Sequence, residues 1–187
     1  MKAKICIGIS SGEYIKAKTV ATIFSLIKAH PELDLIIKQS CLVHNNRNDI
    51  VEEALTKGYT HIFFIDSDMC FSPKILERLL SRDKDIVAGD YNKRNLNNES
   101  VVKLLKNDII KGKYTELFEC ESAGTGCMLI KTDVFKNISK PYFAFSDEIQ
   151  KEEVGEDTFF CLKAKRYGYK IWCDPTIEIG HIGEYIY

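Results

Sequence analysis

The sequence lacks any apolar run long enough to cross a lipid bilayer, for which about 20 consecutive apolar residues are needed. Residues 1–7 include lysines but no apolar core followed by a small-residue cleavage site, which argues against a secretory signal. A formal net charge of -1 and the lack of a long basic run argue against nonspecific nucleic-acid binding. We therefore expect a cytoplasmic protein with no transmembrane segment and no nucleic-acid partner.

Disulfide and zinc motifs are missing as well. The seven cysteines are odd in number and scattered, and no two of them form a Cys-x-x-Cys pair. We interpret them as reduced thiols of the core in a reducing compartment, in preference to a disulfide or zinc framework.

The residues that are present fit one compact α/β domain. The chain has 187 residues, of which 45% are hydrophobic and 28% charged, so it can build a sizeable core. Apolar runs and helically spaced apolar residues alternate, which predicts a mostly parallel central sheet flanked by helices. The predicted strands cover residues 4–9, 33–37, 61–68, 86–88, 101–105, 114–120, 126–130, 170–173 and 177–179, and the predicted helices cover about 20–27, 49–57, 73–80, 132–135 and 156–167.

The most informative segment is residues 61–68, with the sequence HIFFIDSD. A buried strand there delivers Asp66 and Asp68 to its carboxyl end, where they share a face if the strand continues or converge if it turns. Converging carboxylates are costly unless a cation lies between them, and a divalent cation that also binds phosphate satisfies them. The alternative is that Asp68 caps a turn or helix.

Polar residues also lie near the ends of other predicted strands. Ser10 follows the first strand, and Arg47 and Asn48 precede the helix that leads into the Asp66 strand. Ligands of α/β sheets collect at the carboxyl ends of the strands, where we expect these side chains to gather. A guanidinium can pair with diphosphate oxygens at a helix amino terminus. Taken alone, however, the pair fits better a surface arginine beside a capping asparagine.

Three later features complete the candidate site. Gly124-Thr125-Gly126 enters a hydrophobic strand and lets a ligand approach the backbone, although a bulge or tight turn explains the glycines as well. Glu156-Asp157 opens a helix, where acids ordinarily complement the helix dipole. His181 lies between Gly180 and Gly183 after a strand and can turn towards a cation. Carboxylate and imidazole ligands together suit Mn2+ better than Mg2+.

The strand-borne Asp66-Ser67-Asp68, the late Glu156-Asp157 and the final Gly180-His181, in this order, resemble the GT-A glycosyltransferases. These enzymes move a sugar from a nucleotide sugar to an acceptor. The resemblance covers Ile5 to Gly183 and implies a single GT-A (Rossmann-like) domain over residues 1–187. In it, approximately residues 1–90 bind the nucleotide, and residues 91–187 form the acceptor-binding and catalytic half. The resemblance is weakest over residues 90–121, which we expect to face the acceptor.

The resemblance also implies roles for single residues. Asp68 coordinates Mn2+ (or Mg2+) with His181, and Asp66 contacts the metal shell or the ribose. Asp157 is the catalytic base of an inverting transfer, and Glu156 either positions the acceptor or supports the residues that contact it. The donor is a nucleotide-diphosphate sugar, UDP-linked in preference to GDP-linked, and the acceptor is a glycan or another hydroxyl-bearing molecule. The implied nucleotide-sugar contacts are Ser10, Arg47, Asn48, Asp66, Ser67, Gly124, Thr125 and Gly126.

Two other functions stay open. A haloacid-dehalogenase-type phosphohydrolase also places its nucleophile in a strand-end Asp-x-Asp. Its motif, however, has Thr or Val where this chain has Cys70, and the motif usually lies on the first strand. A noncatalytic nucleotide-sugar-binding module would keep the fold without the reaction. Tyr142, Phe143 and Phe145 fit the core better than an acceptor platform, although stacking against an acceptor is the alternative.

Overall fold

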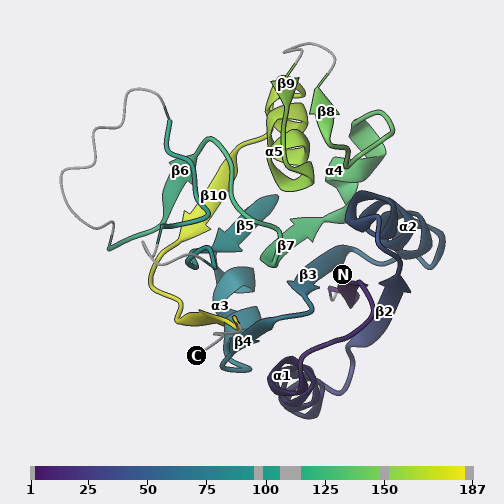
Figure 1. The fold of residues 1–187 in the computed structure, drawn as a ribbon, viewed down its shortest axis with the longest axis vertical. Helices are drawn as coiled ribbons and strands as arrows, with labels where there is room; N and C mark the ends of the chain where they lie inside the picture. The colour runs from purple at the N-terminus through teal and green to yellow at the C-terminus, as the bar shows by residue number, and fades with distance from the viewer. Residues whose placement is uncertain (1–2, 95–98, 106–114, 148–151, 184–187) are drawn as a thin grey trace.

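The computed structural model describes residues 3–94, 99–105, 115–147 and 152–183. They form an α/β fold in which helices cover both faces of a central sheet (Figure 1), as the alternation of strands and helices predicts. None of the helices in these ranges is long and apolar enough to cross a membrane.

The main sheet has seven strands in the described ranges, in the order β2-β1-β3-β7-β5-β10-β6. β1 pairs in parallel with β2 and with β3, and β5 pairs in parallel with β10. β7 is antiparallel to both β3 and β5, and β6 is antiparallel to β10, so the remaining strands all point the same way. The strands are β1 (Ile5–Ser11), β2 (Asp34–Gln39), β3 (His61–Asp66), β5 (Ile86–Gly89), β6 (Phe118–Cys120), β7 (Cys127–Lys131) and β10 (Ile171–Asp174).

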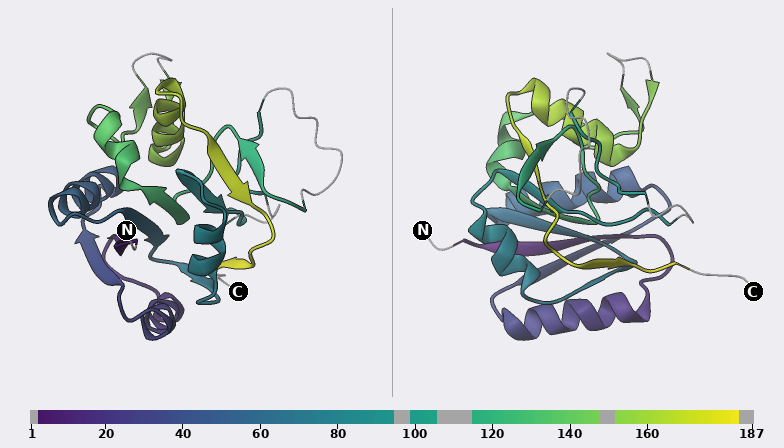
Figure 2. Two further views of the ribbon diagram at one scale, coloured as in Figure 1. Left: turned by 180° about the vertical axis from the view of Figure 1, so that it is seen from behind. Right: turned by 90° about the vertical axis from the view of Figure 1, so that its left-hand side faces the viewer.

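Two hydrophobic clusters hold the helices on opposite faces of this sheet, as the side view in Figure 2 shows. One cluster joins α1 and α3 to the sheet, and the other joins α2, α4 and α5. The apolar residues alternate along the strands and therefore supply both clusters: Phe63 and Ile65 of β3 belong to the first, and Ile62 and Phe64 to the second. The helices are α1 (Ala17–Ala29), α2 (Val43–Thr56), α3 (Ile75–Ser81), α4 (Thr132–Asn137) and α5 (Glu156–Arg166).

Two short antiparallel ribbons lie outside the main sheet. β4 (Met69–Phe71) pairs with β11 (Ile179–His181), so that His181 lies opposite Met69. β8 (Ser146–Asp147) pairs with β9 (Glu152–Glu153) directly before α5. The first ribbon was not expected, because no strand was predicted between the strand at 61–68 and the helix at 73–80. It brings the last described strand to the paired aspartates.

Some predicted boundaries are wrong. α2 begins at Val43, so Asn45 to Asn48 lie inside its first turns and do not precede it. No strand is found at residues 101–105, where a single bridge joins Lys103 to Ser122, and the predicted strand at 114–120 shortens to β6 with residue 114 outside the described ranges. The last strand begins at Ile179, where the prediction ended it.

The buried face of α1 also differs from the prediction. Its apolar pattern places Val20 and Phe24 in the core, but these side chains are 50% and 72% exposed. The helix instead buries Thr19 and Thr22 beside Ile23 and Leu26. Apolar spacing alone did not identify the face, because small polar side chains occupy two of its buried positions.

All seven cysteines are free, but they are not all core residues as the sequence predicted. Five of them are buried, whereas Cys41 is exposed and Cys70 is partly exposed. Burial raises the pKa of the Cys6 and Cys120 thiols to about 12, which keeps them protonated and unreactive.

Candidate functional site

The candidate site lies where β1 and β3 end side by side, with Ser10 opposite Asp66 in the parallel register. β3 buries its apolar residues between the two layers of helices and ends at Asp66. Ser67 forms the turn, and its carbonyl accepts a hydrogen bond from the backbone N–H of Lys16 at 2.9 Å. The chain then enters β4, so Asp66 and Asp68 lie on either side of a tight turn.

Asp68 and His181 face each other across the β4–β11 ribbon. The Nε2 atom of His181 lies 3.4 Å from Oδ2 of Asp68, and the backbone N–H of Ile182 donates to the Asp68 carbonyl at 2.8 Å. The Nδ1 atom of His181 is 2.8 Å from the carbonyl oxygen of Asn92. Because a carbonyl can only accept, Nδ1 carries the proton and, in the neutral ring, the lone pair of Nε2 points to Asp68. This orientation is typical of metal-binding histidines.

The charges around Asp68 keep its carboxylate ionised. Burial by itself would raise its pKa, but the hydrogen bond that Nε2 donates when the His181 ring is protonated and the charge of Arg94 outweigh burial and lower the pKa. The same contact with Asp68 raises the pKa of His181. Nη1 of Arg94 lies 3.0 Å from the Asp68 Oδ2 that also faces His181. Sequence reasoning missed Arg94, which stands in a polar stretch without a motif.

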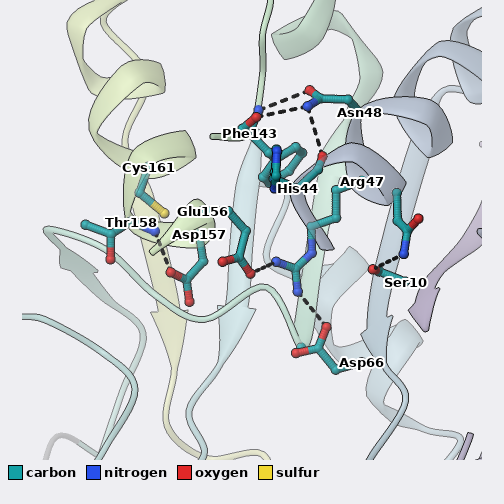
Figure 3. A network of polar contacts seen from close by, with 12 residues as sticks. Ser10, His44, Arg47, Asn48, Asp66, Phe143, Glu156, Asp157, Thr158 and Cys161 are labelled. Carbon is teal, nitrogen blue, oxygen red and sulfur yellow. Dashed lines mark hydrogen bonds and ion pairs between the residues drawn. The ribbon is translucent and has the colours of Figure 1, made fainter. Parts of the chain in front are cut away.

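Arg47 is the buried cation of the site. Its side chain is only 3% exposed and donates through Nη2 to Oδ1 of Asp66 at 2.6 Å and through Nη1 to Oε1 of Glu156 (Figure 3). Burial would lower the pKa of Arg47, but the two carboxylates outweigh it and raise the pKa. The predicted diphosphate contact is therefore already engaged by two acids, from β3 and from α5.

Asp157 lies beside this network in the first turn of α5, as predicted. Its Oδ1 accepts a hydrogen bond from the backbone N–H of Thr158 at 2.6 Å. Burial raises the pKa of Asp157, and the charge of Glu156 raises it further. A carboxylate with a raised pKa is a stronger base than an exposed aspartate. Glu156 and Asp157 differ in environment, since Glu156 is paired with Arg47.

The two glycines before β7 pack against Tyr91. The Tyr91 hydroxyl is the first atom that a Cβ on Gly124 would meet, and a Cβ on Gly126 would lie 2.6 Å from the same hydroxyl and 2.8 Å from Oδ2 of Asp66. The N–H of Gly126 donates to the Tyr91 hydroxyl at 3.0 Å, and its carbonyl accepts from the N–H of Asp66 at 3.2 Å. The side chain that closely approaches these glycines is thus a tyrosine of the protein itself, whereas the sequence prediction was approach by a ligand.

Tyr91 was not identified from the sequence, although it connects both parts of the site. Its buried ring meets the ring of His181 edge-on, with 5.4 Å between the centroids. Its hydroxyl supports Gly126 and, through that residue, the backbone of Asp66. The tyrosine follows β5, so a polar residue at the end of a predicted strand was the only available signal.

Two of the remaining predicted contacts, Ser10 and Asn48, have hydrogen-bond partners within the protein. The Ser10 hydroxyl accepts from Nδ2 of Asn46 at 3.2 Å. The Asn48 amide donates to the carbonyls of His44 and Phe143, each at 2.9 Å, and accepts from the N–H groups of Tyr142 and Phe143 (Figure 3). Asn48 therefore fastens the segment before β8 to α2. Thr125 is buried, and its hydroxyl has no partner among the described residues.

The aromatic residues before β8 separate into two groups. Tyr142 and Phe143 are buried, and Phe143 stacks on Phe160 with 4.9 Å between the ring centroids. Phe145 is largely exposed and meets His44 edge-on at 4.8 Å. Tyr142 and Phe143 are thus core residues, as favoured from the sequence, whereas Phe145 is accessible.

The side chains of Asp68 and His181 fit a divalent cation only if a bound ligand or water supplies the other coordinating atoms. Asp68 and His181 present one carboxylate oxygen and one imidazole nitrogen to the same point, while Asp66 is engaged by Arg47. Within the described residues, no three His, Cys, Asp or Glu side chains are grouped as a metal site. Two protein ligands leave positions open for water and phosphate oxygens, which is how Mg2+ is commonly held beside phosphates. The imidazole is the reason to prefer Mn2+.

Comparisons with known proteins inform the fold alone. No protein-family model matches the sequence, and no curated protein matches it either. The crystal structure of A197 from STIV is similar to this structure, with a TM-score of 0.67 and 19% sequence identity. The match covers 96% of this chain and 86% of that chain, so the two proteins have similar folds.

Proposed function

We propose that the protein is a metal-dependent GT-A glycosyltransferase that moves a sugar from a nucleotide-diphosphate sugar to an acceptor hydroxyl with inversion. The observation that carries the proposal is the convergence of two pairs from distant parts of the chain. Asp68 meets His181, and Asp66 is joined through Arg47 to Glu156, next to Asp157. The proposed two-residue cation site and a partly buried carboxylate with a raised pKa thus adjoin the same strand end.

The residues divide the reaction between them. Asp68 and His181 would hold Mn2+ or Mg2+, which when bound neutralises charge on the diphosphate. Asp157 accepts the proton of the acceptor hydroxyl as that oxygen bonds to the anomeric carbon of the sugar. The bond from this carbon to the diphosphate oxygen breaks, and its electron pair leaves on the diphosphate. Arg47 holds Asp66 and Glu156 in place, and Tyr91 supports His181 and Gly126.

UDP is the nucleotide we propose first, with GDP second, and the acceptor is a glycan or another hydroxyl-bearing molecule. The phosphohydrolase alternative is less well supported, because its nucleophile would be Asp66, whose carboxylate is held by the buried Arg47. A noncatalytic sugar-nucleotide-binding module would need neither the base nor its burial.

The test is a panel of UDP-sugars and GDP-sugars with and without Mn2+, measured first by thermal shift. A donor at about 100 times its dissociation constant should raise the melting temperature by roughly 5–10 °C. Asp68→Asn should lose the Mn2+-dependent part of this shift. Asp133→Asn, which removes an exposed acid paired with Lys136, should keep it.

Turnover is then measured as release of UDP or GDP from the donor that binds. Release that requires Mn2+ and is lost in Asp157→Asn supports glycosyl transfer. A donor that binds with Mn2+ but is neither hydrolysed nor transferred to any acceptor would identify a binding module. No shift with any sugar nucleotide contradicts the proposal.

A further inference from the structure

Arg94 forms an ion pair with Oδ2 of Asp68, the carboxylate oxygen that a bound cation would need. Its Nη1 atom lies 3.0 Å from Oδ2 of Asp68, and the same oxygen faces Nε2 of His181 at 3.4 Å. The Arg94 side chain is 56% exposed, whereas those of Asp68 and His181 are 13% and 15% exposed. A solvated guanidinium therefore closes the open side of the Asp68–His181 pair.

The backbone that carries Arg94 is anchored next to the pair. Tyr91 is buried against His181, and the Asn92 carbonyl holds Nδ1 of the same imidazole at 2.8 Å. Two backbone hydrogen bonds also join this segment to residues 99–101. The N–H of Lys93 donates to the Glu99 carbonyl at 2.7 Å, and the N–H of Val101 donates to the Tyr91 carbonyl at 3.0 Å. A guanidinium displaced from Asp68 therefore stays close to it, because the backbone is held at the three residues that precede Arg94.

A divalent cation and Arg94 cannot share this oxygen. They repel each other at contact distance, and an ion pair with one exposed partner is weakly held. A cation bound between Asp68 and His181 therefore displaces the guanidinium. The displaced group then lies beside the anionic ligand that completes the metal's coordination, and guanidinium binds phosphate oxygens in a bidentate manner.

The position of Arg47 adds to this argument. It was the predicted diphosphate contact, but both of its terminal nitrogens bind carboxylates and its side chain is buried. An arginine at the mouth of the site is better placed for a ligand than one locked beneath it. Arg94 is also on the metal side of the site, where the diphosphate of a donor would lie.

We infer that Arg94 is a diphosphate-binding residue that exchanges Asp68 for the diphosphate of the nucleotide when the cation binds. This inference rests on the proposed function, because it needs the cation at Asp68 and a nucleotide diphosphate as ligand. It assigns two opposite effects to one side chain. Arg94 weakens binding of the free cation and strengthens binding of the diphosphate that follows.

The experiment is calorimetry of Mn2+ alone, and then of UDP and GDP at saturating Mn2+, on wild type and Arg94→Gln. The variant should bind Mn2+ roughly two- to fivefold more tightly, because a competing cation is gone. It should bind the nucleotide roughly ten- to hundredfold more weakly, because a charge-assisted contact is gone. Arg94→Lys should recover part of the nucleotide affinity. Lys93→Gln removes a neighbouring charge that pairs with Glu99 and should change either affinity by less than about twofold.

Tighter Mn2+ with weaker nucleotide binding supports the inference. Nucleotide affinity unchanged in Arg94→Gln overturns it, whatever happens to Mn2+, and so does a loss of both affinities. Wild-type protein that binds neither Mn2+ nor nucleotide instead contradicts the proposed function, before Arg94 is tested. A melting temperature for Arg94→Gln equal to that of wild type shows that the changes are local.

Discussion

Nη1 of Arg47 donates a hydrogen bond to the carboxylate of Glu156, which lies 109 residues further along the chain. The same guanidinium binds Asp66. One buried cation therefore joins Asp66, at the end of β3, to the helix that bears the proposed base. Because it binds both carboxylates, Arg47 also holds Asp66 and Glu156 at a fixed separation.

Removing this cation should destabilise the fold. Arg47→Met leaves Asp66 and Glu156 without their partner, and breaking a buried ion pair costs about 3–5 kcal/mol. Chemical denaturation measures the free energy of unfolding. Lys136→Met, which breaks an exposed pair with Asp133, should cost less than about 1 kcal/mol. Equal losses in the two variants would show that the Arg47 network contributes no more than a surface pair.

His181→Ala should weaken Mn2+ binding more than it weakens nucleotide binding in metal-free buffer, because the proposed role of the imidazole is to coordinate the metal. Two calorimetric titrations measure the two affinities. His61→Ala is the matched control, since His61 begins β3 at the end remote from Asp66. Equal weakening in both titrations would point to a nucleotide contact or to misfolding, which circular dichroism separates.

Asp157→Asn should reduce turnover by roughly a hundred- to ten-thousandfold, the effect typical of a lost general base, with little change in donor affinity. Because burial and Glu156 raise the pKa of Asp157, wild-type kcat/KM should fall, as the pH is lowered, at a pH above the ordinary aspartate value of 3.8. Glu156→Gln should keep the base and shift its pKa downwards. Full activity in Asp157→Asn with none in Glu156→Gln would reverse the two roles.

Gly124→Ala should destabilise the fold by about 1–3 kcal/mol, because the added methyl group meets the Tyr91 hydroxyl and the side chain of Val101. Gly12→Ala is the control, since a Cβ there meets nothing within 4 Å. Thermal unfolding compares the two. A Gly124→Ala protein as stable as Gly12→Ala would mean that the Tyr91 contact is easily rearranged.

Stability should fall in acid partly through Asp174, which is fully buried and bound by Arg78, Arg82 and Thr176. Burial would raise the pKa of this carboxyl, but its hydrogen bonds outweigh burial and lower the pKa to about 2. The stabilisation is therefore complete above the ordinary aspartate pKa of 3.8 and is lost as the pH falls from there to about 2. Asp174→Asn should cost roughly 2 kcal/mol at neutral pH and flatten this part of the profile. An unchanged profile would exclude Asp174 as a source of the acid sensitivity.

The main sheet was predictable because its strands are short apolar runs bounded by polar turns. The His61–Asp66 strand and the Glu156 helix were found in place for this reason. Exposure of Phe24 was not predictable, because helical spacing cannot decide between adjacent faces when Thr19 and Thr22 serve as core residues. The β4–β11 ribbon was missed because three-residue strands carry too little pattern to be recognised.

The candidate site was predictable as a set of residues but not as a set of contacts. Acids at strand and helix ends indicate Asp66, Asp68 and Asp157, since such positions are defined by local sequence. The pairing of Arg47 with Glu156 depends on how α2 and α5 pack, which no local pattern contains. Tyr91 and Arg94 stand in a polar segment, where neither spacing nor neighbours distinguish them from loop residues.

The β4–β11 ribbon sets an order of events during synthesis on the ribosome. Asp66 and Asp68 emerge more than a hundred residues before His181, so a nascent chain carries the carboxylates long before their imidazole partner. The proposed cation site can form only after β11 has been made and has paired with β4. Metal capture should therefore follow folding of the sheet, and a growing chain should have no complete site with which to bind a sugar nucleotide.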